Sequence, residues 1–376
     1  MVNSNEYSTN NKIASVTTWG FSSFIVTLTK SGFLGMASYI IFSYSNINSY
    51  IAAISGTIIG ILPLLIFIFI TNNSNNKDII DLNNNLFGKS IGNILNIILN
   101  ITVIFMSIIA LYNISQFVNI EYMPYTNKNY LRILILVPIV YAASKDISVI
   151  SRISQIILII NLTIFLLTIL GCINSCKLEN IFPIMKDGIP PVLSGTLIYS
   201  IFTTFPIFLL TIIPQSIISK EKNKTTKLFL MYLLGNFMLI AIILLTICIL
   251  GEDLIPIFRY PEYMVLQKFK LFEIIERVEN TLSMQFIFNS IMYLIISFHF
   301  MIQSVKKIIK NQKIVDLLPY ILAIVILILS NIIFKNEIES TNFIKNILPY
   351  IILIGIFLPM FITFIGIISK NKVSKN

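Results

Sequence analysis

The chain has 376 residues, of which 56% are hydrophobic and 12% are charged, and its mean hydropathy is +0.86. These values exclude an ordinary soluble domain and indicate a polytopic membrane protein. The net charge of +10 could indicate a nucleic-acid partner. The distribution of the basic residues is better explained by their enrichment on one side of a membrane.

Ten segments are predicted to span the membrane, since a helix needs about 20 apolar residues to cross the hydrocarbon core. Residues 1–12 are polar and no cleavable signal follows them, so the first span is expected to stay in the mature protein. The predicted spans are 13–42, 50–70, 91–118, 131–144, 153–172, 191–213, 228–250, 283–303, 317–334 and 347–368.

The charges of the connecting segments predict the orientation. With the N-terminus inside, the inner segments hold sixteen basic and six acidic residues, whereas the outer segments hold ten basic and eleven acidic residues. Basic residues mark the cytoplasmic side, so both termini are expected to be cytoplasmic. Lys30 is the basic residue that this assignment leaves deep within a span.

The first span contains the stretch IVTLTKSGFLGMASYIIF, residues 25–42. As one straight helix, the whole span would be about 45 Å long against a hydrocarbon core of roughly 30 Å, so it must tilt or break. Gly32 and Gly35 flank the expected break, because glycine weakens a helix and frees backbone groups. Alternatively, both glycines only allow close helix packing.

Lys30 carries a charge that is costly near mid-membrane. It is therefore expected to face a cavity, where it pairs with a carboxylate of a ligand or stands in for a bound cation. The alternative is that the side chain reaches to the outer headgroups.

The sixth span repeats the pattern of interruption in the stretch LSGTLIYSIFTTFPIFLLTIIPQSI, residues 193–217. Pro206 removes an intrahelical hydrogen bond behind Thr203 and Thr204, whose hydroxyls can satisfy the freed carbonyls. A simple proline kink is the alternative. Interruptions at corresponding places of two five-helix halves, about 13–172 and 191–368, favour an inverted-repeat transporter with its substrate between the broken helices.

An amino acid zwitterion suits such a site, because half-helix ends offer amides to an anion and carbonyls to an ammonium group. Tyr112, with Asn113 and Gln116, shares one side of the third span and is expected to face the interior. The residues predicted to bind the ligand are Lys30, Ser31, Gly32, Phe33, Gly35, Tyr112, Ser200, Thr203, Thr204 and Phe205.

Other chemical motifs are weak. Cys172 and Cys176 form a C-x3-C pair at the outer end of the fifth span, which leaves a disulfide or metal pair open but poorly supported. His299 is better explained by packing than by proton relay. The chain has no P-loop, nucleophile elbow or paired-carboxylate site, so an enzyme, a cofactor and a metal site are not expected.

Residues 251–282 form the longest outer connection, and from Glu262 to Glu279 the apolar residues alternate with charges at roughly helical spacing. This pattern predicts one or two amphipathic helices, either as an interfacial anchor or as a lid over an outward-facing cavity.

This outer segment resembles the spore germination permeases, the B subunits of germinant receptors. The resemblance rests on YPEY (260–263) and FEIIERVE (272–279), with LFGKSIGNIL (86–95), EYMPYTN (121–127), SVISRISQII (148–157) and NIFPIMKDGIPPVLSG (180–195) in the same order. The signature residues are Tyr260, Pro261, Phe272, Glu276, Arg277 and Glu279.

The resemblance implies a single all-α domain of ten transmembrane helices over residues 1–376, related to the amino acid-polyamine-organocation transporters. Its fold would be a leucine-transporter-like 5+5 inverted repeat with helices 1 and 6 broken. Such proteins lie in the inner membrane of spores with a membrane-embedded A subunit and a lipoprotein C subunit, and they bind a small germinant, often an amino acid. An ordinary amino acid permease and a structural scaffold are the competing functions. The first span also departs from the family pattern, because it lacks a proline after the glycines and adds Lys30.

Overall fold

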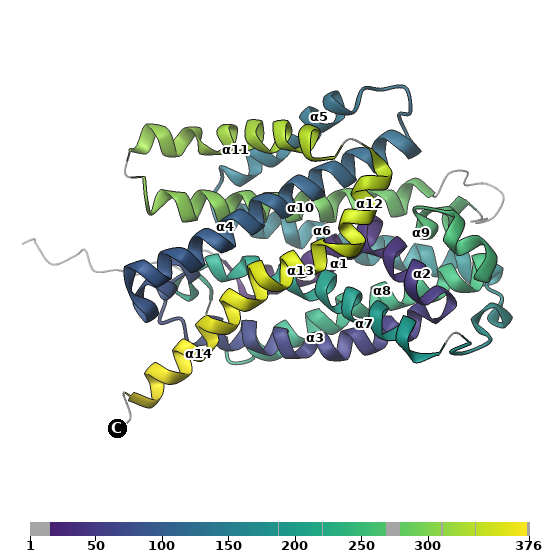
Figure 1. Ribbon diagram of the computed structural model, residues 1–376, viewed down its shortest axis with the longest axis horizontal. Helices are drawn as coiled ribbons and strands as arrows, with labels where there is room; N and C mark the ends of the chain where they lie inside the picture. The colour runs from purple at the N-terminus through teal and green to yellow at the C-terminus, as the bar shows by residue number, and fades with distance from the viewer. Residues whose placement is uncertain are drawn as a thin grey trace, which may run out of the picture.

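The computed structural model describes residues 16–186, 188–219, 221–267, 279–309, 311–334 and 336–373. Within these ranges the chain is helical except for turns and one bridge between Val16 and Ile218, and most helices run along the long axis of the molecule (Figure 1). The α-helices are α1 (Thr18–Gly32), α2 (Ser38–Ser45), α3 (Ser49–Asn72), α4 (Ile79–Glu121), α5 (Lys128–Ala143), α6 (Ile147–Cys172), α7 (Ile189–Thr204), α8 (Lys224–Leu254), α9 (Pro261–Gln267), α10 (Glu279–Lys306), α11 (Gln312–Ile333), α12 (Glu337–Asn346), α13 (Leu348–Ile352) and α14 (Leu358–Val373).

Shorter helical turns of the 3-10 and π types join or interrupt these helices. They are η1 (Phe33–Ala37), η2 (Asn46–Asn48), η3 (Ile173–Ser175), η4 (Leu178–Ile181), η5 (Phe205–Ile212), η6 (Gln215–Ile217), η7 (Ile255–Ile257) and η8 (Leu353–Phe357).

Eight helical stretches in the described part of the chain are long and apolar enough to cross a membrane, so the protein is an integral multi-pass membrane protein. The described residues of the ten predicted spans are mainly helical, but α1 and α5 have only 15 and 16 residues. The eight stretches are Ser38–Asn72, Ile79–Glu121, Ile147–Ser175, Ile189–Ile212, Lys224–Ile257, Ser283–Lys306, Gln312–Ile333 and Leu348–Asn371.

Short polar side chains fix where several helices begin. The Thr17 hydroxyl accepts a hydrogen bond from the Gly20 amide at 3.1 Å, and the Asp78 carboxylate accepts one from the Asp81 amide at 3.1 Å. Asparagines precede α5, α11 and α12 in the same role. The first amides of a helix have no partner within it, so these caps stabilise the starts of α1, α4, α5, α11 and α12.

The backbone of the first predicted span departs from helical geometry between α1 and α2. Leu34 has an extended ψ of 129°, and Gly35 has φ +70° and ψ −4°. A left-handed conformation costs other residues roughly 1–2 kcal/mol, which explains a glycine at this position. In the sixth predicted span, α7 gives way at Phe205 to the 3-10 turns of η5, with Pro206 at their start.

Helix contacts recur in pairs between the two halves of the chain. α3 packs on α7, and α8 packs on α1. α5 packs on α10, and α11 packs on α4; likewise α6 packs on α10, and α14 packs on α4. Each pair consists of two equivalent contacts. The helices of the second contact stand at the same places along the opposite predicted half of the chain as the helices of the first contact. α1 lies at the centre of this arrangement, whereas α5 and α11 lie together along one edge (Figure 1).

Candidate functional site

A narrow cavity lies between the two interruptions. The space open to the centre of a water molecule is about 20 Å³, so a larger ligand requires the walls to move. The two interrupted helices meet closely here, because a Cβ added at Gly32 would lie 2.0 Å from the carbonyl oxygen of Phe202. The cavity is lined by Ser31, Gly32, Met106, Ala110, Phe202, Phe205, Pro206, Leu209, Ser290, Tyr293, Ile352 and Ile356.

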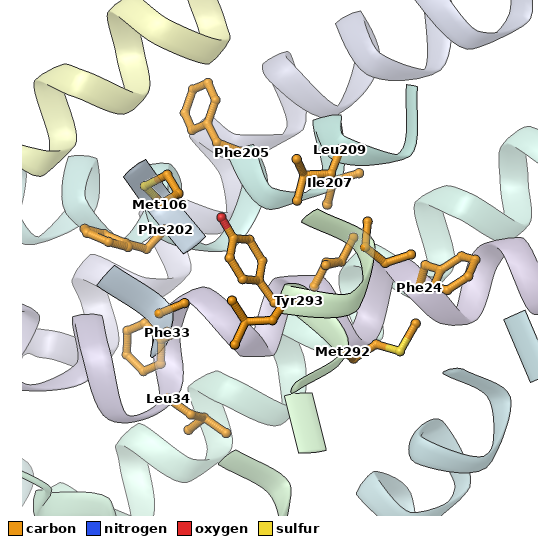
Figure 2. Packing of buried hydrophobic residues seen from close by; sticks show 14 of the residues in the cluster. Phe24, Phe33, Leu34, Met106, Phe202, Phe205, Ile207, Leu209, Met292 and Tyr293 are labelled. Carbon is orange, nitrogen blue, oxygen red and sulfur yellow. The ribbon is translucent and has the colours of Figure 1, made fainter. Parts of the chain in front are cut away.

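The walls of this central cavity are mainly apolar. Figure 2 shows Tyr293 of α10 with its hydroxyl directed toward Met106 and Phe202. The Ser31 hydroxyl donates a hydrogen bond to the Leu28 carbonyl at 2.8 Å and therefore already has a partner within α1. The cavity suits an apolar group flanked by one or two hydroxyls.

Lys30 lies outside the lining of the central cavity, on the side of α1 that faces α6 and α10. Its side chain is fully buried, and Nζ donates a hydrogen bond to Gln285 Oε1 at 2.7 Å. Gln285 in turn donates to the Asn161 carbonyl at 2.9 Å, and the amides of Asn161 and Asn289 bond each other at 2.9 and 3.1 Å. No acidic side chain within the described ranges forms an ion pair with Lys30.

Three further predicted ligand residues have partners within the helix bundle. The Phe33 ring packs edge-on against Tyr199 at 5.1 Å. The Thr203 hydroxyl donates to the Tyr199 carbonyl at 2.8 Å, and the Thr204 hydroxyl lies 3.1 Å from the Tyr232 hydroxyl. Both threonines thus stabilise α7 just before its change of geometry and do not line the cavity. Ser200 is buried on the same helix.

Tyr112 lies against α5 and not against the central cavity. The Arg132 guanidinium is 5.3 Å from the centre of the Tyr112 ring, and the Gln116 amide donates to the Tyr112 hydroxyl at 3.0 Å. Arg132 also bonds Asn331, so this group ties α4 to α5 and α11.

Two sets of contacts join segments that are distant in the sequence. Arg259 forms an ion pair with Glu337 at 2.9 Å and donates to Thr341 at 2.5 Å, which joins the segment after α8 to α12. Just before α1, the Val16 amide donates to the Ile217 carbonyl at 3.0 Å, and the Ser219 amide donates to the Val16 carbonyl at 2.9 Å.

Part of the predicted outer signature can be located. The Tyr260 ring packs edge-on against Phe117 at 4.9 Å, and burial raises the pKa of Tyr260 to about 12, so its phenol is neutral. Pro261 begins α9 and is buried. Phe272, Glu276 and Arg277 lie outside the described residues, as do most of the residues that the amphipathic pattern covers, and the side chain of Glu279 is likewise not described.

The weaker motifs show no metal chemistry in the described part of the chain. Cys172, Cys176 and Cys248 are free thiols, and no group of three or more acidic, His or Cys residues there can hold a metal ion. His299 is buried beside an inner cavity that Asp146 also lines.

The hydrogen-bond partners of Lys30 and of the interrupted backbone at Gly35 were not predicted from the sequence. Asn161, Gln285 and Asn289 are amides within predicted spans, and the spacing of the last two places them on one face of α10. That spacing is the signal by which they could have been found. At the interruption, Glu262 Oε1 accepts hydrogen bonds from the Gly35 amide at 3.0 Å and from the Ser38 hydroxyl at 2.7 Å. Glu262 lies inside the quoted YPEY stretch, yet nothing in its local pattern distinguishes it from a surface carboxylate.

The fold is similar to that of solved membrane transporters. A Na⁺-coupled sialic acid symporter, solved in a substrate-bound outward-open state, is similar with TM-score 0.61 and 12% identity, over 92% of this chain and 79% of that chain. MhsT, crystallised in complex with L-phenylalanine, is similar with TM-score 0.62 and 10% identity, over 92% of this chain and 87% of that chain. Both neighbours have the leucine-transporter fold of the amino acid-polyamine-organocation transporters, and at these identities they show the fold alone.

The family follows from the sequence match. Residues 17–338 match the spore germination protein family, so the chain belongs to that family. No curated protein is similar enough to be matched. The predicted resemblance is thereby confirmed at the level of the family.

Proposed function

We propose that the protein is the germinant-sensing membrane subunit of a spore germinant receptor and binds a small molecule, an amino acid, between broken helices 1 and 6. The observation that carries the proposal is the central cavity, which lies where Gly32 of α1 meets Phe202 of α7. Membership of the spore germination family supports the same function. The expected partners are a membrane-embedded A subunit and a lipoprotein C subunit in the spore inner membrane.

We further propose ten spans arranged as two inverted repeats. α1 and α2 then form one broken span, and α5 crosses as a short fourth span. The paired helix contacts support this arrangement, because an inverted repeat requires each contact between the halves to have a counterpart with the roles exchanged.

Cysteine labelling tests the proposed orientation. Asn342 and Asn223 are both exposed. With both termini in the cytoplasm, as proposed, Asn342 would lie outside and Asn223 inside, so a membrane-impermeant thiol reagent added outside is expected to modify Asn342→Cys and to leave Asn223→Cys unmodified. The measurement is the extent of labelling in intact cells and after permeabilisation. The reverse pattern would contradict the topology.

The position of Lys30 favours a receptor over a cation-coupled transporter, because its side chain can supply a fixed positive charge in place of a bound cation. Its ammonium group already occupies a buried cluster of amide side chains, whereas a cation-coupled transporter must exchange its ion in every cycle. Secondary transport of an amino acid is the alternative function. The fold that the chain shares with two solved transporters is the reason to test it.

Filling the cavity tests the proposed binding site. Ala110→Leu adds three carbons to a cavity with only about 20 Å³ of open space, so the variant is expected to insert but to lose about 1–3 kcal/mol of stability through overpacking. The germinant concentration for half-maximal response should rise at least about tenfold, because the ligand loses its space. The measurement is germination of spores that carry the variant, with protein abundance in the spore membrane quantified.

Ala142→Leu provides the matched control, because Ala142 is buried in α5 and does not line the cavity. Overpacking there should lower thermal stability by roughly 1–3 kcal/mol and leave the germinant concentration dependence of the surviving protein unchanged. A normal response from Ala110→Leu would exclude ligand binding in this cavity. Uptake of the amino acid by vegetative cells that express the protein would favour the transporter.

A further inference from the structure

A long groove runs along the surface where α4, α10 and α11 lie side by side (Figure 1). The space in it that is open to the centre of a water molecule is about 470 Å³, which lies within the size range of ligand pockets in proteins. Ile97 and Ile101 are more than half exposed in its wall, so the groove opens toward the surrounding lipid. We call it the inner groove, because it lies at the start of α4, which is cytoplasmic in the proposed topology.

The inner groove is bounded at one end by a sharp bend of α4 at Gly88. The backbone there has φ +76° and ψ 170°, a conformation that glycine adopts far more readily than other residues. Asn96 ties the two arms of the bend together, because it accepts a hydrogen bond from the Asn83 amide at 2.9 Å and donates one to the Ile80 carbonyl at 3.1 Å. The arm before Gly88 thus folds back on the arm after it and contributes Ile80 to the wall of the groove.

The charged groups of the groove lie at this bend. Lys89 follows Gly88 directly, is exposed and forms no ion pair with an acidic side chain of the described ranges. Lys307, which also lines the groove, pairs with Asp78 and Asp81. The uncompensated charge among these groups is therefore the ammonium of Lys89, and the exposed amide of Asn93 follows it one turn further along α4.

Beyond the amides, the groove is apolar and as long as one lipid leaflet is deep. Ile97, Ile101 and Ile104 of α4 face it together with Leu322 of α11. Ile104 lies fifteen residues after Lys89, which is about 22 Å along a helix. Half of a bilayer that is about 40–45 Å thick with its headgroups has a similar depth. Charge, amide and hydrocarbon thus follow one another in the same order as the phosphate, the ester groups and an acyl chain of a phospholipid.

We propose that the inner groove binds one anionic phospholipid of the cytoplasmic leaflet, with Lys89 at the phosphate and an acyl chain along Ile97, Ile101 and Ile104. Basic pockets between transmembrane helices on the cytoplasmic side suit anionic headgroups. A zwitterionic lipid fits less well, because Lys307 already occupies the two nearby carboxylates that could accept from its ammonium group. The inference rests on the proposed orientation and is independent of germinant binding.

Photocrosslinking of the wild-type protein locates the lipid. The full-length protein is reconstituted in nanodiscs with a trace of phosphatidylglycerol that carries a diazirine on one acyl chain, and the labelled peptides are identified by mass spectrometry. Label is expected on residues 97–104 and on the peptide that contains Leu322. An excess of unlabelled phosphatidylglycerol should remove it, whereas the same excess of phosphatidylcholine should not. Label distributed over all lipid-exposed helices, or label that no lipid displaces, would overturn the proposal.

Native mass spectrometry measures the affinity of the site. Wild type should bind phosphatidylglycerol about fivefold or more tightly than phosphatidylcholine with the same chains, as expected for one lysine at an anionic headgroup. Lys89→Gln should bind both lipids with the wild-type affinity for phosphatidylcholine. Lys145→Gln is the matched control and should keep the wild-type preference, because Lys145 is an exposed lysine expected on the same side that does not line the groove.

The remaining outcomes separate a lipid site from its alternatives. Ile101→Trp fills the groove from its exposed wall and should weaken binding of both lipids at least about fivefold, and unchanged binding would overturn the position of the acyl chain. Equal loss of preference in Lys89→Gln and Lys145→Gln would show that general surface charge attracts the lipid, and it would overturn a specific site. Displacement of the labelled lipid by an equal concentration of free glycerol phosphate would assign a phosphate site without a lipid and would also overturn the proposal. If Lys89→Gln fails to fold, the photocrosslinking of wild type still decides.

Discussion

Spores that carry Gly32→Ala are expected to lose most of their germinant response although the protein still inserts. The added Cβ would lie 2.0 Å from the Phe202 carbonyl oxygen and 3.3 Å from Pro206 Cγ. A backbone carbonyl cannot turn aside as a flexible side chain does, so α1 and α7 must move apart. Overpacking of this kind typically costs about 1–3 kcal/mol, and here it changes the walls of the cavity itself. The germinant concentration for half-maximal response should rise more than tenfold.

Gly235→Ala is the matched control for this change. Gly235 of α8 also faces α1, but a Cβ there would meet Thr29 Cβ at 3.3 Å and Thr29 Cγ2 at 3.4 Å, where the neighbour need shift by only a few tenths of an ångström. That variant should respond nearly as wild type does. Equal responses of the two variants would mean that the close approach of α1 and α7 has no part in sensing, and the central site would have to be assigned elsewhere.

The eight long apolar helical stretches of the described residues and the change of backbone geometry at Leu34 and Gly35 were predictable from the sequence because they rest on local properties. Runs of apolar residues identify the helices, and the pair Gly32 and Gly35 marks the place where a long span changes geometry. Pro206 marks the second place in the same way. These signals depend only on residues within one or two helical turns, so they do not depend on how the rest of the chain packs.

The partners of the predicted site residues could not be predicted in the same way. Lys30 and Gln285 are 255 residues apart, and their contact depends on the crossing of α1 and α10. The third span supplies Ala110 to the cavity while Tyr112, two residues on, faces Arg132. Which face of a helix meets a cavity is set by tertiary packing, because in a bundle most faces are buried and hydrophobic periodicity distinguishes them poorly.

Glu262 illustrates the same limit for an outer segment. In the sequence it is one of eleven acidic residues predicted on that side, most of them readily solvated. Only the packing of α9 against α2 and α10 places it on the freed amide of Gly35. A residue of this kind is found by asking which buried polar atoms lack a partner and not by its neighbours in the chain.

Lys30→Met is expected to impair the germinant response without lowering the thermal stability of the protein. The ammonium group is fully buried, and its hydrogen bond to Gln285 is to a neutral amide, so the charge is poorly compensated. Removing a buried ion relieves a desolvation cost of several kcal/mol, whereas the unpaired Gln285 oxygen costs about 1–3 kcal/mol. Thermal stability of the purified variant should therefore be unchanged or higher. The germinant response should fall more than tenfold, because the variant lacks the charge that we propose to stand in for a bound cation between α1, α6 and α10.

Lys128→Met serves as the control for loss of a lysine charge, since Lys128 is exposed at the start of α5 and should affect neither quantity. Unfolding temperature and germinant concentration dependence, measured on the same variants, decide the matter. A parallel loss of stability and response in Lys30→Met would make Lys30 a structural residue that holds α1 to α10. A normal response across germinant concentrations would show that the charge is dispensable. The expected result is a stable variant with an impaired response. It would mean that the chain keeps the buried ammonium group at a cost in stability because sensing requires it.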